Sequence, residues 1–223
     1  MIASRRNLAV RALAAAIVLA TIGAAVAQSR SRGTPGKFDY YVLSLSWSPS
    51  FCESAAGARS QQCGARPYSF VVHGLWPQYE HGYPQSCQVP PPRLDHRIVD
   101  RMLDLMPARR LVYHEWDTHG TCSGLDQHAY FDLVRQARGA VKIPSQFADP
   151  QQQLTVKPVD IVDAFVKANA GLAADGITLD CSGTRLGEVR ICLTRDLKFR
   201  GCGADQVRSC RSDSVLLPPV RGR

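Results

Sequence analysis

The chain has 223 residues, of which 45% are hydrophobic and 21% are charged. This length suits one domain of moderate size or two small ones, and the composition excludes a chain that is disordered throughout. Lysine and arginine outnumber aspartate and glutamate by 27 to 19, which gives a formal charge of +8. A basic balance favours an anionic partner, although net charge bears on solubility and non-specific binding rather than on chemistry.

The first 27 residues have the pattern of a secretory signal peptide. Three arginines precede an apolar, alanine-rich stretch at residues 12–25, and Ala25-Val26-Ala27 matches a cleavage site. A membrane anchor is the alternative, but the stretch is short, and no later uncharged apolar run reaches about 20 residues. Ser4-Arg5-Arg6 also resembles a twin-arginine export signal. We expect an exported protein without a membrane anchor, in the periplasm or outside the cell, with a single catalytic domain at residues 28–223.

All eight cysteines lie in this mature part. An even number of cysteines together with an export signal predicts up to four disulfides, formed in an oxidising compartment. Zinc binding is the alternative, but the chain has no C-x-x-C pair, and successive cysteines are 8 to 59 residues apart. Eight cysteines allow 105 connectivities, so their spacing alone does not say which of them pair.

The hydrophobic pattern predicts strands and helices along the whole mature chain. Runs rich in aromatic and β-branched residues predict strands at 38–47, 68–72 and 188–193. Apolar residues at helical spacing predict helices at 94–106, 126–141 and 158–170. The tail from Ser212 shows no pattern. Because the strands are few and the loops long, we expect one α+β domain with a mostly antiparallel central sheet, surrounding helices and disulfide-linked loops.

The first candidate segment reads FVVHGLWP and runs from Phe70 to Pro77. Taken alone, a histidine before glycine is typical of a turn with a satisfied ring. His73, however, follows a strand that is predicted to be buried, and sites are commonly built where strands end. Trp76 is either a core residue or a ring on which a base stacks.

The second candidate segment reads HEWDTHGTC and begins at His114. A His-Glu pair followed by a histidine suggests a zinc protease, but that motif needs its histidines four residues apart on one helical face. His114 and His119 are five residues apart, so they lie about 140° apart around a helix. Glu115 and His119 are the i, i+4 pair instead, and a carboxylate beside an imidazole raises its pKa and orients it for proton transfer.

Several histidines, a carboxylate and a basic chain suit RNA transesterification without a metal. The attacking 2′-hydroxyl must lose a proton and the leaving 5′-oxygen must gain one, and two imidazoles can serve as base and acid. A further cation would stabilise the negative charge that gathers around phosphorus. Because the nucleophile belongs to the substrate, such an enzyme cleaves RNA and not DNA.

Both segments resemble the active-site segments of the ribonuclease T2 family of secreted endoribonucleases, and SLSWSPSFC and HGTCSG are most similar to its bacterial members. The resemblance implies an α+β fold and cleavage of single-stranded RNA without metal or cofactor. The reaction would have low base specificity and pass through a 2′,3′-cyclic phosphate to 3′-phosphate ends. His119 would be the general base, His73 the general acid and His114 the phosphate ligand. Glu115 would orient His119 or polarise the phosphate, and Trp76 would stack on a base.

The resemblance also implies a disulfide arrangement and a substrate. The disulfide pairs would be Cys52–Cys63, Cys87–Cys122, Cys181–Cys210 and Cys192–Cys202. The partner would be RNA, and we expect the protein to be a monomer.

Thr118 departs from the family pattern, which commonly has lysine directly before the last histidine. The missing charge predicts catalysis ten- to a hundredfold below that of a lysine-bearing relative, which is about 1.4–2.7 kcal/mol. Arg109 or Arg110 are candidates to supply this charge. The same departure keeps open a secreted RNA-binding homologue with impaired catalysis, and a zinc-dependent hydrolase is the third hypothesis.

Overall fold

The structure is a computed structural model that describes residues 33–64, 66–206 and 210–220. The expected signal peptide, residues 1–27, lies outside the described residues. Within them, no helix is long and apolar enough to cross a membrane.

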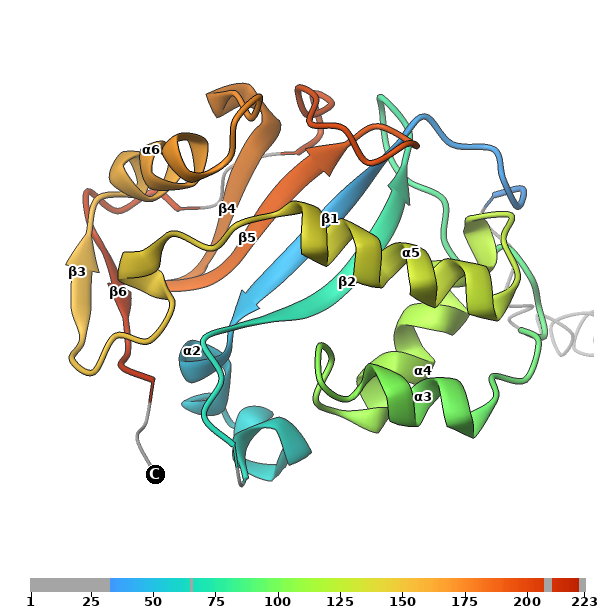
Figure 1. The fold of residues 1–223 in the computed structure, drawn as a ribbon, viewed down its shortest axis with the longest axis horizontal. Helices are drawn as coiled ribbons and strands as arrows, with labels where there is room; N and C mark the ends of the chain where they lie inside the picture. Colours follow the sequence, from blue (N-terminus) through green and yellow to red (C-terminus); the bar gives the residue numbers. More distant parts are fainter. Residues whose placement is uncertain (1–32, 65, 207–209, 221–223) are drawn as a thin grey trace, which may run out of the picture. The chain divides into compact units, whose positions relative to one another are not determined.

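Six strands in the described part of the chain form one mixed sheet (Figure 1). Strand β1 pairs antiparallel with β2 on one side and with β5 on the other, and β4 also pairs antiparallel with β5. The short β6 runs parallel to β5 and antiparallel to β3. The expected α+β class and the mostly antiparallel sheet are therefore confirmed. The strands are β1 (Tyr40–Trp47), β2 (Phe70–Gln78), β3 (Leu154–Val156), β4 (Ile177–Ser182), β5 (Arg185–Leu193) and β6 (Val215–Leu217).

The helices lie around this sheet, and α5 crosses over β1 and β2 (Figure 1). The hydroxyl of Tyr130 on α5 donates to the carbonyl of Leu75 on β2 at 3.0 Å, which fixes the helix against the strand. The α-helices are α2 (Ser48–Cys52), α3 (His96–Met102), α4 (Arg109–Thr118), α5 (Gln127–Ala140) and α6 (Pro158–Ala168). The 3-10 helices are η1 (Gly57–Arg59), η2 (Gln61–Cys63), η3 (Gly120–Cys122), η4 (Ser145–Phe147) and η5 (Ala174–Gly176).

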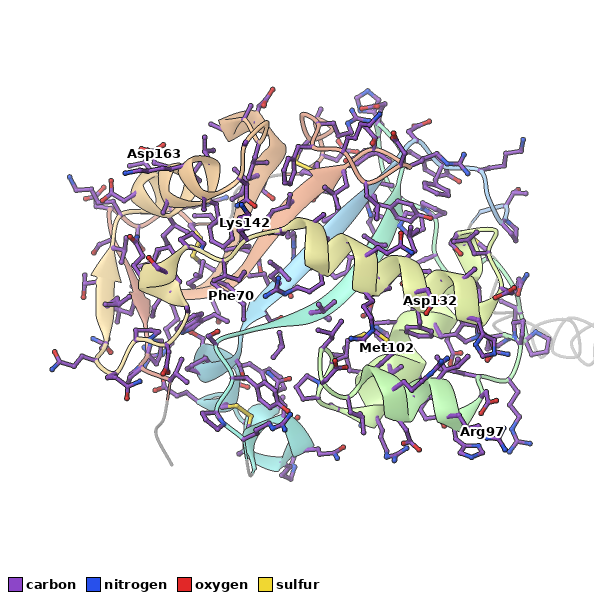
Figure 2. All side chains as sticks on the ribbon, viewed as in Figure 1. Phe70, Arg97, Met102, Asp132, Lys142 and Asp163 are labelled. Carbon is purple, nitrogen blue, oxygen red and sulfur yellow. A yellow bond between two sulfur atoms is a disulfide. The ribbon has the colours of Figure 1, made fainter. Side chains whose placement is uncertain are left out.

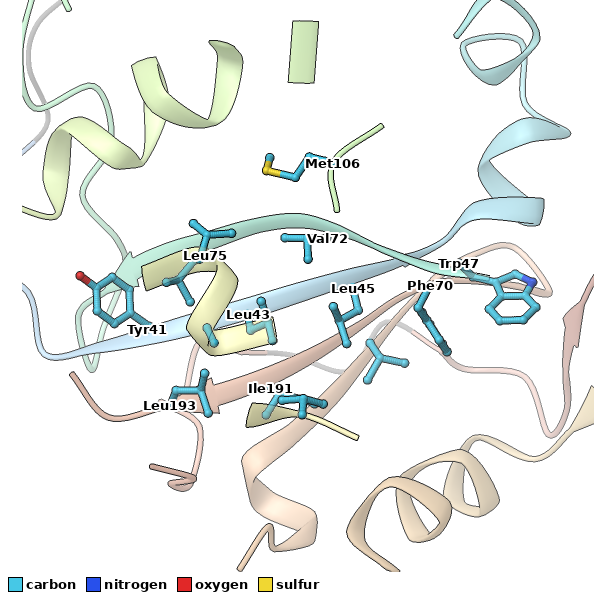
Figure 3. Close-up of a cluster of buried hydrophobic side chains, with 14 of the residues drawn as sticks. Tyr41, Leu43, Leu45, Trp47, Phe70, Val72, Leu75, Met106, Ile191 and Leu193 are labelled. Atoms are coloured by element: carbon cyan, nitrogen blue, oxygen red, sulfur yellow. The ribbon is translucent and has the colours of Figure 1, made fainter. Parts of the chain in front are cut away.

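The two faces of the sheet have different chemistry. Alternate residues of β1, from Tyr41 to Trp47, point into the main apolar core beneath α5 (Figure 3). Because side chains alternate along a strand, the residues between them point to the other face. That second face carries a small apolar cluster with Tyr40 and Val42, followed by the small polar residues Ser44 and Ser46.

Side chains divide between core and solvent as helical amphipathicity requires. Phe70 and Met102 are buried, whereas Arg97, Asp132 and Asp163 are exposed on α3, α5 and α6 (Figure 2).

The described residues contain all four expected disulfides: Cys52–Cys63, Cys87–Cys122, Cys181–Cys210 and Cys192–Cys202. The second of them links the loop before α3 to the turn that follows α4.

Several elements differ from those expected. The three-residue strands β3 and β6 were not predicted, because each depends on its partner strand and carries too short a pattern of its own. Helix α2 was not predicted either; it directly follows the strand expected at 38–47, and Pro49 lies in its first turn, where proline is well tolerated. Strand β2 extends to Gln78 and does not end at His73.

Candidate active site

The two candidate segments come together on the second face of the sheet, the one that carries Ser44 and Ser46 of β1. His73 and Trp76 lie on β2, His114 and Glu115 on α4, and His119 caps the end of α4. The ring of Trp76 is near two of the histidine rings, with its centroid 5.3 Å from that of His73 and 5.3 Å from that of His119. The structure thus brings together all five residues that the sequence predicted for the site.

His73 occupies an irregularity in the middle of a strand. Ser44 of β1 pairs with Gly74, but the next residue, Leu45, pairs with Val72, so His73 is the extra residue of a β-bulge. The expectation that His73 ends the strand is therefore wrong. A bulge can re-aim a side chain without ending the sheet, and here it places the ring beside residues of β5.

Glu115 is almost fully buried, with 1% of its side chain exposed. Its Oε2 accepts a hydrogen bond from the Trp76 indole at 2.8 Å, and its Oε1 lies 3.6 Å from Nε2 of His73. Burial raises the pKa of Glu115 to about 7, although the positive charge of His73 and the Trp76 hydrogen bond oppose the rise. Gly74 makes room for these groups, because a Cβ there would lie 2.0 Å from Oε2 of Glu115.

The expected pairing of Glu115 with the His119 side chain is not what the geometry shows. His119 follows the last residue of helix α4, and its backbone N–H donates to the carbonyl of Glu115. The Glu115 side chain, however, contacts His73 and Trp76.

His73 has a second carboxylate on its other ring nitrogen. Its Nδ1 lies within hydrogen-bonding distance of Oε1 of Glu188 on β5. Burial alone would lower the pKa of His73, but the hydrogen bond and charge of Glu188, together with the charge of Glu115, raise it above its ordinary value. Burial would raise the pKa of Glu188, yet its bond to His73 and the charge of Arg190 lower it to about 2.

His119 has the opposite electrostatic environment. Burial, followed by the positive charges of His114 and His73, lowers the pKa of His119 to about 3. Its Nδ1 is buried and has no hydrogen-bond partner among the described residues. His119 is therefore neutral at neutral pH, whereas the two carboxylates favour a protonated His73.

Two cavities adjoin the site, one lined by His73 and the other by His119. The first, of about 550 Å³, is lined by His73 and Glu188 together with residues of α2 and β4. The second, of about 540 Å³, is lined by Trp76, His114, Thr118, His119 and Arg190.

Glu188 and Arg190 are functional candidates that the sequence analysis missed. In EVRICL, within the strand predicted at 188–193, residues 188, 190 and 192 lie on one side, and this pattern does not distinguish a charged residue of a site from one that faces solvent. Ser46 of β1 pairs with Glu188 of β5 and Ser44 pairs with Arg190, so both charged residues lie on the face of the sheet that carries the site. The arginines expected to supply charge do not line the site: Arg109 pairs with Asp100, and neither it nor Arg110 lines either cavity, whereas Arg190 lines the second.

Comparisons with known proteins show which family and which fold this chain is similar to. A model of the ribonuclease T2 family matches residues 38–202. A ribonuclease of Aeromonas hydrophila is 42% identical over 199 residues, which are 86% of this chain and 91% of that protein. Among solved structures, a mutant of RNase MC1, the bitter gourd seed ribonuclease, in complex with 5′-UMP is 25% identical, with a TM-score of 0.60 over 80% of this chain and 97% of that one. The RNase-related protein from Calystegia sepium shares the fold, with a TM-score of 0.64 at 21% identity over 82% of this chain and 98% of that one.

Proposed function

Because the chain belongs to the ribonuclease T2 family, we propose that it is an exported endoribonuclease that cleaves single-stranded RNA by metal-independent transesterification. The products would be a 2′,3′-cyclic phosphate and then a 3′-phosphate end, with low base specificity. The observation that carries this proposal is the pair of histidines whose rings both lie 5.3 Å from that of Trp76: His73 contacts two carboxylates, which favour its protonated form, whereas burial lowers the pKa of His119 to about 3.

His119 is the general base of the proposed reaction. A base must be unprotonated before the reaction, and burial keeps His119 in that state. An anionic phosphate bound beside it would raise its proton affinity toward the range in which it can take the proton of the 2′-hydroxyl.

His73 is the general acid. The carboxylates of Glu115 and Glu188 favour its protonated form, so it has a proton to give to the 5′-oxygen as that oxygen leaves phosphorus. Its Nε2 is 3.6 Å from Glu115, beyond a normal hydrogen bond, which leaves this N–H available to a substrate.

Positive charge around the phosphate comes from two elements. His114 is exposed on α4 and Arg190 lies on β5, and both line the cavity that contains His119. Thr118 lines the same cavity and brings a hydroxyl but no charge. Arg190 replaces only part of the charge that a lysine at position 118 would provide, because its guanidinium also pairs with Glu188 and lies 3.7 Å from Asp180.

Two cavities at one site can accept two successive nucleotides of an RNA chain. We place the nucleotide that carries the attacking hydroxyl in the cavity with His119 and Trp76, and the leaving nucleotide beside His73. Trp76 then contacts the first base, as aromatic residues commonly do in single-stranded RNA recognition.

Product analysis on dinucleotides tests this proposal. We expect a 2′,3′-cyclic product that forms equally in EDTA, no cleavage when the 2′-hydroxyl at the scissile position is removed, and near-complete loss of turnover in His119→Ala. Full activity in that variant would overturn the assignment of the base. RNA binding without cleavage by the wild-type protein would indicate the catalytically impaired homologue instead.

A further inference from the structure

Glu188 has contacts that fix both oxygens of its carboxylate. Oε1 faces Nδ1 of His73 and also lies 3.4 Å from the hydroxyl of Ser46. Oε2 accepts from Arg190 through Nε at 2.9 Å and lies 2.7 Å from a terminal guanidinium nitrogen of the same residue. Only 11% of the Glu188 side chain is exposed. The carboxylate is therefore held between one imidazole and one guanidinium.

The backbone determines this arrangement. Glu188 and Arg190 are two residues apart on β5, so they lie on the same face of the sheet and pair across β1 with the small residues Ser46 and Ser44. The bulge on β2 turns His73 toward them from the other side of β1. Residues of three neighbouring strands therefore surround Nδ1 of His73: His73 itself on β2, Ser46 on β1 and Glu188 on β5.

The bond at one nitrogen of an imidazole decides what the other nitrogen can do. When Nδ1 donates to a carboxylate, the ring is fixed in orientation and Nε2 faces the reacting groups. A buried, ionised carboxylate also stabilises the imidazolium, and burial without such a partner would destabilise it.

We propose that Glu188 is the positioning residue of the general acid: held in place by Arg190, it binds Nδ1 of His73, keeps the ring protonated and presents Nε2–H to the leaving 5′-oxygen. This inference rests on the proposed function. During the step, the proton passes from Nε2 to the 5′-oxygen as its bond to phosphorus breaks. His73 becomes neutral, and Glu188 stays ionised because it takes no proton.

Other charged groups around His73 also raise or lower its pKa. Glu115 on α4 favours the protonated ring, and Arg190 disfavours it. His119, at the end of α4, is itself affected by the charge of His73. Farther around the first cavity lie Glu53, Asp180 and Arg185. Loss of the Glu188 charge leaves Arg190 uncompensated beside His73, which adds to the loss of the protonated form.

The test is the pH profile of Glu188→Gln. A general acid must be protonated, so His73 governs the alkaline limb of kcat/KM. We expect this limb to move to lower pH by about one unit or more, with kcat reduced at pH 8 far more than at pH 5 and with KM little changed. Asp104→Asn is the matched control, because Asp104 is also a carboxylate paired with an arginine, Arg135, but lines neither cavity, and its profile should be that of the wild type.

Titration of His73 by NMR in 15N-histidine-labelled protein separates this inference from the proposed function. We expect the His73 midpoint to fall in Glu188→Gln and to be largely restored in Glu188→Asp, which keeps the charge. If the His73 midpoint is unchanged in Glu188→Gln and kcat falls equally at every pH, the inference is overturned, and the role of Glu188 is only structural. If the wild type does not cleave RNA, the proposed function fails, and the titration still decides whether Glu188 controls His73. If Glu188→Gln does not fold, Glu188→Asp is used for the test. Its shorter side chain holds the charge farther from Nδ1, so the His73 midpoint should still fall, but by less than the loss of the charge would cause.

Discussion

At the scale of single residues, Thr118 marks where the site lacks a charge. Its hydroxyl lies 3.5 Å from Nδ1 of His114, and it lines the cavity with His119. Thr118→Lys would place an ammonium group in that cavity, where negative charge gathers in the transition state.

We expect Thr118→Lys to raise turnover on homopolymer RNA about tenfold, and up to a hundredfold, which corresponds to about 1.4–2.7 kcal/mol. Thr118→Val keeps the shape without a charge and should leave turnover close to that of the wild type. Unchanged or lower turnover in the lysine variant would show that Arg190 and His114 already meet the need for charge.

Gly74 tests how closely the site is packed. A Cβ at this position would lie 2.0 Å from Oε2 of Glu115 and 2.3 Å from the indole nitrogen of Trp76, so Gly74→Ala must break the bond between them. We expect turnover to fall at least tenfold and the free energy of unfolding to fall by about 1–3 kcal/mol. Gly139→Ala on α5 is the control, because a Cβ there meets nothing within 4 Å. Wild-type turnover in Gly74→Ala would mean that the Trp76–Glu115 bond has no role.

At the scale of elements, the end of α4 is held by a disulfide. Cys122 in η3 bonds Cys87, 35 residues earlier, and His119 lies between α4 and this turn. Replacing both cysteines with alanine should lower the free energy of unfolding by about 2–4 kcal/mol and, in addition, lower turnover at temperatures where the protein is still folded.

The Cys181–Cys210 pair provides a matched control for this prediction. It spans 29 residues, a similar loop, and neither cysteine lines either cavity. Its removal should cost similar stability with little effect on the turnover of the folded protein. Equal losses of turnover in the two double variants would show that the Cys87–Cys122 disulfide has no special role at the site.

At the scale of the whole molecule, the site makes stability depend on pH. Folded Glu115 keeps its proton up to about pH 7, whereas the unfolded chain releases it near 4.5. The folded state therefore binds more protons in this interval, so the free energy of unfolding falls as pH rises through it. His73, whose pKa is also raised, adds a loss in the same direction. His119 opposes both, because its pKa is lowered to about 3 and the unfolded chain binds the extra proton below about pH 6.5.

Glu115→Gln should remove the Glu115 contribution and leave that of the histidines. In urea unfolding at pH 5 and pH 8, we expect the change in the free energy of unfolding with rising pH to be more negative in the wild type than in the variant by roughly 3 kcal/mol. Parallel declines in the two proteins would mean that Glu115 titrates in the folded state as it does in the unfolded chain.

The long elements were predictable because their patterns are local. The strand at 38–47 and the helices at 126–141 and 158–170 appear within a few residues of their expected ends, as β1, α5 and α6. Strands β3 and β6 were not predictable, because three residues are too few to show an alternating hydrophobic pattern. The two strands depend on their hydrogen bonds to each other.

By itself, the sequence was enough to predict the histidines of the candidate site, the family and the class of the fold from residue types at fixed short spacings. The disulfide pairs followed from the resemblance that those spacings support. The tertiary structure alone decided that Glu115 faces His73, that Glu188 contacts the same ring from 115 residues away, and that Arg190 lines the cavity with His119. The physical reason is that burial and cross-strand pairing set the pKa of each group, and both depend on residues that are distant in the chain.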